Sequence, residues 1–304
     1  MENFEIQILG CGSALPSKKN NQSSQFLTLR NKSFMIDCGE GAQIQMRRLD
    51  IKTARMNHIF ISHLHGDHIF GLIGLISTLG MMGRTAELCI HAPVELETLL
   101  QPQLDFFCNE NTFKVSFFPH DPRKHALIYE DRSTTVHTIP LKHRVPCCGF
   151  LFKEKPKQRH LRKDMIDFYQ IPVKDLVRIK NSEDYITPTG ETIANQRLTS
   201  DATPSKSYAY CSDTAYSEKI IPMIEGIDCL FHETTFLHAD LARAKETGHS
   251  TAQQTAEIAK KAQVKKLVIG HFSARYANQK LLLQEAQAIF PNTVLGEDGL
   301  KILV

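Results

Sequence analysis

The sequence predicts a mixed α/β fold in which strands and helices alternate along most of its 304 residues. Short runs of Val, Ile, Leu and Phe recur along the chain, and segments with the apolar periodicity of helices lie between many of them. Polar side chains of the kind that bind metal follow several of the apolar runs, at the edge where α/β sheets place their sites. A hydrophobic content of 42% is enough for a large core.

The predicted strands are short apolar runs bounded by polar or turn-forming residues. In chain order they are residues 4–9, 25–30, 32–37, 58–62, 87–92, 113–118, 135–141, 147–153, 207–212, 228–233, 266–270 and 300–304. Apolar spacing of three and four predicts helices over 40–49, 67–80, 93–104, 217–225, 236–246, 251–262 and 279–289. Ser250 or Thr251 can cap the helix at 251–262.

Residues 154–205 interrupt this alternation. The segment is charged, contains many turn signals and lacks long apolar runs, so we interpret it as an insertion between two strands of one domain, 1–304. Its start is basic: the stretch 153–163 holds six Lys or Arg and one acidic residue, although the whole chain carries only +3. A charge run is usually a solvated surface. The alternative is a binding site for an anionic partner.

Composition also indicates where the protein acts. The first ten residues, MENFEIQILG, show no basic segment followed by an apolar one, so no secretory signal is expected. The longest nearly apolar run, 69–82, is too short to cross a bilayer. The eight cysteines include no C-x-x-C pair, which favours reduced, buried thiols over disulfides. We therefore expect a cytoplasmic protein that does not contact membranes.

The stretch SHLHGDH, residues 62–68, follows an apolar strand and crowds four candidate metal ligands together. Residues two apart on an extended chain point the same way, so His63 and His65 can bind one ion together. Gly66 lets the chain turn, so that Asp67 and His68 can face a second ion from the start of a helix. A helix cap with incidental histidines is the less favoured interpretation.

Three further candidate ligands each follow a predicted strand: His143, Asp213 and His271. Any one alone is more often a packed or capping residue, but together with His63 they meet at the carboxyl edge of the sheets. Imidazole and carboxylate ligands suit Zn²⁺, with Mn²⁺ or Fe as substitutes. Asp213 could bridge two ions. Two ions about 3.5–4 Å apart can activate water and hold the oxygens of a phosphodiester.

These motifs resemble the ribonuclease Z family, the tRNA 3′-processing endonucleases of the metallo-β-lactamase superfamily. SHLHGDH alone is a signature of the superfamily, whereas the combination of HETT, HST and HFSARY marks the family. The resemblance extends over LGCGSALPSKKNNQSS (9–24), IDCGEGAQIQMRR (36–48), PLKHRVPCCGF (140–150), YCSDT (210–214), FHETTF (231–236), GHSTAQQTAEIA (248–259) and IGHFSARY (269–276).

The resemblance implies a four-layer αββα sandwich, a homodimer and two zinc ions per chain. It assigns His63, His65 and His143 to one ion, Asp67, His68 and His271 to the other, and Asp213 to both. It also makes Asp67 the proton acceptor and gives His249 a role at the scissile phosphate or leaving group. Ser273 and Arg275 resemble phosphate-contacting positions. The implied substrate is precursor tRNA, cut just 3′ of the discriminator nucleotide to leave a 3′-OH on the tRNA and a 5′-phosphate on the trailer.

In the family a flexible basic arm grips the tRNA, and here that arm would be 154–195. Its expected RNA contacts, together with Lys153 beside them, are Lys155, Lys157, Arg159, Arg162 and Lys163. Two other functions remain open. One is another enzyme of the same fold, such as a small-molecule phosphodiesterase, thioesterase or lactamase; the other is a non-catalytic RNA-binding protein with a structural metal site. His232 and Glu233 are candidates for orienting Asp213 or His249.

Overall fold

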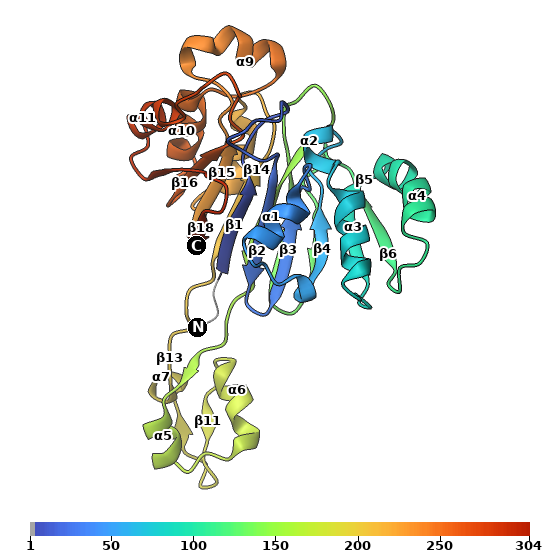
Figure 1. Ribbon diagram of the computed structural model, residues 1–304. Coiled ribbons are helices and arrows are strands. Elements are labelled where there is room, and N and C mark those ends of the chain that lie inside the picture. The colour runs from blue at the N-terminus through green and yellow to red at the C-terminus, as the bar shows by residue number, and fades with distance from the viewer. Residues whose placement is uncertain (1–3) are drawn as a thin grey trace.

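Two seven-stranded sheets pack face to face in the computed structural model, which describes residues 4–304 (Figure 1). The first sheet has the order β18-β1-β2-β3-β4-β5-β6, with bounds Lys301–Leu303, Phe4–Gly10, Ser24–Leu29, Lys32–Ile36, Met56–Phe60, Leu88–Pro93 and Val115–His120. The second has the order β17-β16-β15-β14-β9-β8-β7, with bounds Thr293–Leu295, Leu267–Gly270, Cys229–Glu233, Ser207–Cys211, Cys148–Glu154, Thr134–Pro140 and Leu127–Glu130.

Helices cover the outer face of each sheet, which gives the expected αββα sandwich (Figure 1). The first sheet carries α1 (Ala42–Arg48), α3 (Leu72–Met81) and α4 (Glu95–Phe107). The second carries α8 (Ile221–Ile224), α10 (Ala252–Lys261) and α11 (Lys280–Gln287), and α9 (Leu241–Thr247) lies beyond the end of its strands. Aromatic side chains fill the space between the sheets; Phe60, for example, contacts Phe150 at a ring-centroid distance of 5.6 Å. Thr251 caps α10 and forms a reciprocal capping box with Gln254.

All twelve predicted strands are present, but several helices differ from the prediction. The predicted helix 67–80 is two helices, α2 (Gly66–Ile69) and α3, because Gly71 lies directly against the loop after β3. A Cβ at Gly71 would stand 2.1 Å from the Gly39 carbonyl oxygen, and the Gly71 N–H donates to Cys38 O instead of continuing the helix. Short 3₁₀ turns, Glu218–Ile220 and His238–Asp240, begin the predicted helices at 217–225 and 236–246, and another spans Thr53–Arg55. Strands β7 and β17 were not predicted.

The inserted segment forms a small lobe that projects from one end of the sandwich (Figure 1). It leaves β9 after Glu154 and returns at Ser207, so it spans the insertion seen in the sequence, 154–205, and extends beyond the arm expected at 154–195. Its elements are β10 (His160–Leu161), α5 (Lys163–Phe168), a 3₁₀ turn (Val173–Asp175), α6 (Leu176–Lys180), β11 (Tyr185–Ile186), β12 (Thr192–Ile193), α7 (Asn195–Leu198) and β13 (Thr199–Ser200). A separate cluster of buried apolar side chains, including Ile179, Ile193 and Leu198, gives this arm its own core.

All eight cysteines are free, and all but Cys108 are buried. This agrees with the expectation of reduced thiols that pack as small apolar groups. Within residues 4–304, no helix is long and apolar enough to cross a membrane.

Candidate metal centre and active site

The sequence-predicted ligands meet at one edge of the sandwich. His63 follows β4, His143 follows β8, Asp213 follows β14 and His271 follows β16, while Asp67 and His68 lie in α2. A backbone bond from Cys148 N to Ser62 O ties the two sheets together beside the site, at 3.1 Å. Strand β3 pairs in parallel with β4, β14 with β15, and β15 with β16. Parallel strands end at a common edge, which explains why these residues meet.

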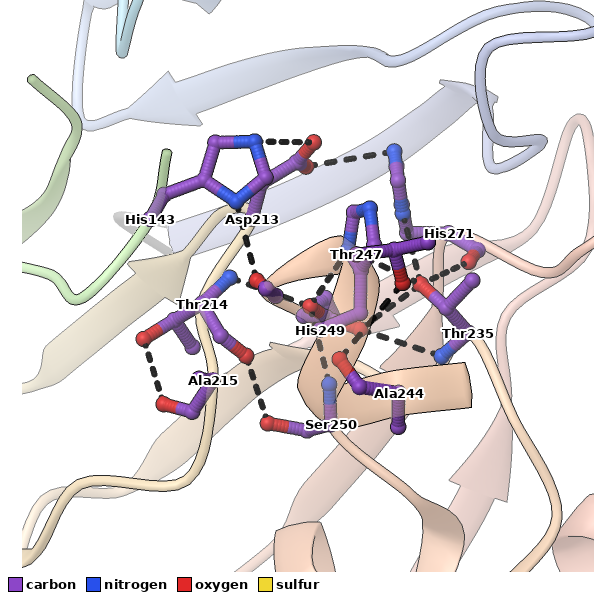
Figure 2. Close-up of polar contacts among 12 residues, drawn as sticks. His143, Asp213, Thr214, Ala215, Thr235, Ala244, Thr247, His249, Ser250 and His271 are labelled. Atoms are coloured by element: carbon purple, nitrogen blue, oxygen red, sulfur yellow. Dashed lines mark hydrogen bonds and ion pairs between the residues drawn. The ribbon is translucent and has the colours of Figure 1, made fainter. Parts of the chain in front are cut away.

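Asp213 lies between two groups of ligand atoms. Its Oδ2 is 3.6 Å from His63 Nε2 and 3.8 Å from His143 Nε2, whereas its Oδ1 is 3.4 Å from His68 Nε2 and 3.1 Å from His271 Nε2. Figure 2 shows His143 and His271 on either side of the Asp213 carboxylate. Ligand atoms of the set His63, His65, His143 and Asp213 all lie within 4.8 Å of one another, as do those of the set Asp67, His68 and His271. The seven residues therefore form two adjoining groups with Asp213 between them.

A metal ion fits these residues because their inward-facing atoms lack other partners. Nε2 of His68, His143 and His271 and Oδ1 of Asp213 are buried and have no hydrogen-bond partner among the described residues. Each of these imidazoles is held from behind through Nδ1: His68 by Asp37 at 2.7 Å, His143 by the Gly248 carbonyl at 2.9 Å and His271 by the Thr235 hydroxyl at 3.0 Å. This arrangement fixes the ring and leaves Nε2 for a metal.

Protonation in the cluster also suits a cation. Burial lowers the pKa of His63, His65 and His143, which favours the neutral imidazole that binds metal. Burial opposes ionisation of Asp67, but His68 and His271 outweigh it and hold the pKa of that carboxyl well below its usual value.

The same balance holds for two other members of the cluster. Burial opposes ionisation of Asp213 too, yet the neighbouring histidines keep its pKa well below the usual range. For His68, burial opposes the charge, but the carboxylates of Asp37, Asp213 and Asp67 raise its pKa well above the usual value. The same carboxylate charge would attract a divalent cation, which would have to displace the His68 proton in order to bind.

His249 stands beside the ligands and is held by a buried carboxylate. Its Nδ1 donates to Glu233 Oε1 at 2.8 Å, and its ring stacks on His271 with centroids 5.4 Å apart (Figure 2). Burial opposes a charge on His249, but Glu233 outweighs it and raises the pKa to about 9. The same Glu233 accepts from the backbone N–H groups of Thr214, Thr235 and Ser250 at 3.0, 3.0 and 3.2 Å. Glu233 thus fixes three loops around the site.

Of the two candidates for orienting site residues, Glu233 contacts His249, whereas the Nδ1 of His232 contacts neither Asp213 nor His249. Nδ1 of His232 points away from Asp213 and His249 and lies 2.7 Å from the Glu233 carbonyl and 3.2 Å from the Thr255 hydroxyl. His232 lies within β15, its side chain is buried, and its contact with the Thr255 hydroxyl joins this strand to α10.

Asp37 is a site residue that the sequence analysis missed. Its side chain is fully buried and accepts from Ser62 N at 2.8 Å, Ser62 Oγ at 2.9 Å and Tyr210 OH at 2.8 Å, in addition to His68. Both Asp37 and His271 have positive φ, 54° and 60°, a conformation that costs energy for a side chain other than glycine. Asp37 comes directly after β3, so the rule that located the other ligands, a polar side chain after a strand, would have found it.

The predicted phosphate-contacting residues lie in the catalytic cavity. Ser273 and Arg275 line a space of about 260 Å³ together with Asp67, Asp213, His249 and His271. Arg275 extends over the Phe236 ring, 5.3 Å from its centroid, and pairs with Asp240 at 3.2 Å.

The predicted arm contacts lie elsewhere and are largely ion-paired. Lys155 binds Glu130 at 2.6 Å, Lys157 binds Glu154 at 2.9 Å, Arg159 binds Asp201 at 2.8 Å and Arg162 binds Asp164 at 3.1 Å. These residues and Lys163 lie in the neck of the arm, which we define as 155–162, and at the start of α5. The arm projects from the end of the sandwich opposite to α2 (Figure 1). The structure therefore does not bring them to the metal cluster.

Comparison with known proteins identifies the family. A ribonuclease Z from Bacteroides fragilis is 59% identical over 302 residues, which cover 99% of each chain. The chain belongs to the ribonuclease Z family. A family member from Porphyromonas gingivalis is 49% identical, again over 99% of each chain. The matched regions therefore cover the arm as well as the sandwich.

Family models and solved structures agree with the fold. A model described as anti-Pycsar protein Apyc1 matches residues 4–166, and a β-lactamase superfamily domain model matches 185–272. The gap between the two matches falls within the arm. The crystal structure of human tRNase Z, short form, superposes with a TM-score of 0.71 at 24% identity and covers 98% of both chains. The metallo-β-lactamase fold protein YhfI from Bacillus subtilis gives 0.68 at 17% identity over both full chains. The metallo-β-lactamase fold expected from the sequence is confirmed.

Proposed function

We propose that this ribonuclease Z family member is a zinc-dependent endoribonuclease that removes the 3′ trailer from precursor tRNA in the cytoplasm. The products are a tRNA with a 3′-OH and a trailer with a 5′-phosphate. Full-length similarity to proteins named ribonuclease Z supports the RNA substrate. The observation that carries the chemistry is the convergence of seven metal-binding side chains whose inward-facing atoms include four without partners among residues 4–304.

Two Zn²⁺ ions per chain are the proposed cofactors, with Mn²⁺ as a substitute. His63, His65 and His143 would hold one ion, Asp67, His68 and His271 the other, and Asp213 would contact both. Bound there, the ions would lower the pKa of water and neutralise charge on a phosphodiester.

Two residues are proposed to move protons. Asp67 lies among the proposed metal ligands, where its carboxylate would accept a proton from the attacking water. The Nδ1 of His249 is occupied by Glu233, which orients the ring so that Nε2 can donate to the leaving 3′-oxygen or to the phosphate. Although burial opposes its charge, Glu233 raises the pKa of His249 to about 9, so the ring carries a proton to donate and we assign it to proton transfer. Its ligand atom also lies within 4.8 Å of those of Asp213 and His271, so the metal content of a His249 variant tests this assignment.

Ser273 and Arg275 are proposed to bind the phosphate of the substrate. Both line the catalytic cavity, and the Arg275 guanidinium can offer a charge-assisted hydrogen bond to a phosphate oxygen. Its pairing with Asp240 keeps the guanidinium beside the cavity before the substrate arrives.

The arm is proposed to bind the body of the tRNA. A cleft of about 1220 Å³ at its base is lined by Lys157, Arg159 and Lys180 from the arm and by Arg132 from the sandwich. Apart from Lys157, the lysines and arginines at the neck would exchange their carboxylate partners for phosphates. The Arg162–Asp164 pair is exposed, and such pairs are worth only about 0–1 kcal/mol, so this exchange is inexpensive; the buried Glu154 would keep Lys157 as its partner.

A homodimer is the proposed assembly. Large apolar side chains are exposed directly after α2 and on α3 and α4: Phe70 is 67% exposed, Met81 79% and Phe106 75%. Exposed apolar side chains of this size are often covered by another subunit. Sedimentation of the purified protein at several concentrations will test this, and a monomer at all of them would contradict it.

The experiment that tests the function compares substrates. The protein is incubated with a 3′-extended precursor tRNA, with a cyclic mononucleotide and with bis(p-nitrophenyl) phosphate, before and after chelation. We expect metal-dependent cleavage of the tRNA with much the highest kcat/KM. Hydrolysis of the small substrates alone would indicate a small-molecule phosphodiesterase. Bound metal without hydrolysis of any of them would indicate an RNA-binding protein with a structural metal site.

A further inference from the structure

A second cavity adjoins the catalytic one. It has a volume of about 390 Å³, within the range of small-molecule sites. The two cavities share His249 and Arg144, and the second is closed on its inner side by His143 and Gly248. A ligand in this space would therefore lie directly beside the metal-binding side chains.

The second cavity is positively charged. Lys142, Arg144 and Lys245 line it, and all three are exposed. None of the three forms an ion pair with any residue between 4 and 304, and no carboxylate occurs among the described residues that line the cavity. Most other basic residues near the site, such as Arg275, already have an acidic partner. Three unpaired cations around one cavity indicate an anionic ligand.

An aromatic ring forms another wall of this cavity. Tyr216 is half-buried, and its hydroxyl donates to Glu218 at 2.7 Å and lies 3.2 Å from Lys261 Nζ. These contacts hold the hydroxyl outside the cavity and fix the plane of the ring. A fixed ring beside unpaired cations can stack a nucleobase while the cations bind the adjoining phosphate.

The backbone ties this cavity to the metal centre. Ala215 N donates to Lys142 O at 2.7 Å, and Lys142 N donates to the Thr214 hydroxyl at 3.1 Å. The segment that carries Asp213 therefore carries Tyr216 and positions Lys142 as well. A group bound by these side chains would be placed at a fixed distance from the scissile phosphate.

We propose that the second cavity is a nucleotide subsite, which seats one of the two nucleotides joined by the scissile phosphodiester. Its base stacks on Tyr216, and its flanking phosphate binds Lys142, Arg144 and Lys245. The inference rests on the proposed function. An RNA chain at the metal centre must continue on both sides of the cut, and the catalytic cavity, at about 260 Å³, is smaller than most small-molecule sites. The second cavity is the adjoining space of suitable charge.

The test uses Tyr216→Ala, Tyr216→Phe and the double variant Lys142→Ala/Lys245→Ala. Lys219→Ala is the matched control, because Lys219 is an exposed cation close in sequence but outside the cavity. We expect Tyr216→Ala to lower kcat/KM for a precursor tRNA by about 5- to 150-fold, the range found for a lost base stack. Tyr216→Phe keeps the ring and should retain most of the activity. Because the three cations share one phosphate, the double variant should flatten the log–log salt dependence of binding by up to about 0.7, the value for one phosphate contact.

Two precursor tRNAs with an abasic nucleotide, placed just 5′ or just 3′ of the cut, identify the seated nucleotide. With one of them, the wild type and Tyr216→Ala should differ by less than twofold, because the stacked base is absent. The subsite would be overturned if Tyr216→Ala had the same kcat/KM as the wild type on intact precursor tRNA. It would also be overturned if the kcat/KM of Tyr216→Ala, relative to the wild type, were as low on both abasic substrates as on the intact one. An equal loss on bis(p-nitrophenyl) phosphate would do so too, since it would mean damage to the metal centre. Failure of the wild type on every tRNA would instead refute the proposed function.

Discussion

Asp37 offers a sharp test of how the metal centre is held. In Asp37→Asn the side chain keeps its shape but one acceptor oxygen becomes an NH₂ donor. If the NH₂ takes the place of Oδ2, it faces Ser62 Oγ, Tyr210 OH and His68 Nδ1; if it takes the place of Oδ1, it faces the Ser62 N–H. At least one buried donor therefore loses its acceptor, and the other bonds lose the carboxylate charge.

The expected cost follows from these contacts. One unsatisfied buried donor costs about 1–3 kcal/mol, and bonds to a charged acceptor are roughly twice as strong as neutral ones. We expect Asp37→Asn to lower the free energy of unfolding by about 2–5 kcal/mol in the metal-free protein. Because Asp37 also fixes the His68 ring, metal affinity should fall by about 10- to 100-fold.

Urea denaturation of chelated protein and competition with a chelator measure the two effects separately. Asp50→Asn is the matched control, because Asp50 has nearly the same φ, 52°, but is exposed. Its variant should match the wild type in both assays. If Asp37→Asn also kept wild-type stability and wild-type metal affinity, the assignment of Asp37 as the residue that positions His68 and Ser62 would be refuted.

Other predictions concern the metals, the proton donor, the arm and acid stability. Asp213→Ala should reduce metal content and activity more than loss of any single histidine, because it removes a contact to both groups of ligands; elemental analysis with equal losses for a histidine variant would contradict this. His249→Ala should keep its metal but lower kcat by roughly 10²–10⁴-fold, and loss of metal would show that it is a ligand. Replacing 155–205 by a short linker should weaken precursor tRNA binding and flatten its salt dependence, whereas unchanged affinity would mean a merely solvated arm. Burial opposes ionisation of Asp228, but hydrogen bonds from Lys265 and Ser207 outweigh it and lower its pKa; this stabilisation is present above the unfolded pKa of about 3.9 and is lost as pH falls below it. The stability difference between wild type and Asp228→Asn should therefore shrink between pH 5 and pH 3, and a constant difference would contradict it.

Local pattern was sufficient to predict the strands and to place the candidate metal ligands at one edge of the sheets, whereas the four-layer sandwich was expected from the family resemblance. Apolar runs marked the strands, and ligands such as His63 and Asp213 came directly after them. Asp37 obeys the same rule but looked ordinary, because its importance lies in what it contacts in three other segments. The interruption between α2 and α3 at Gly71 could not be predicted either, because it results from contact with the loop after β3, which is distant in sequence.

The net charge of a sequence segment does not show which of its charges are paired in the folded arm. The run from 153 to 163 is strongly basic, but its partners Glu130 and Asp201 lie outside it in sequence and neutralise much of the neck. Conversely, Lys245 is distant in sequence from Lys142 and Arg144 and joins them only in the folded protein. Pairing in space, rather than local net charge, decides which cations are available to a ligand.

The most direct test of the account is to map the ends produced from a precursor tRNA with a 3′ extension. We predict one cut directly 3′ of the discriminator nucleotide, a 3′-OH on the tRNA, a 5′-phosphate on the trailer, and loss of cleavage on chelation that Zn²⁺ restores. A cut within the tRNA body, a 2′,3′-cyclic phosphate at the new end, or cleavage that persists after complete removal of metal would contradict it.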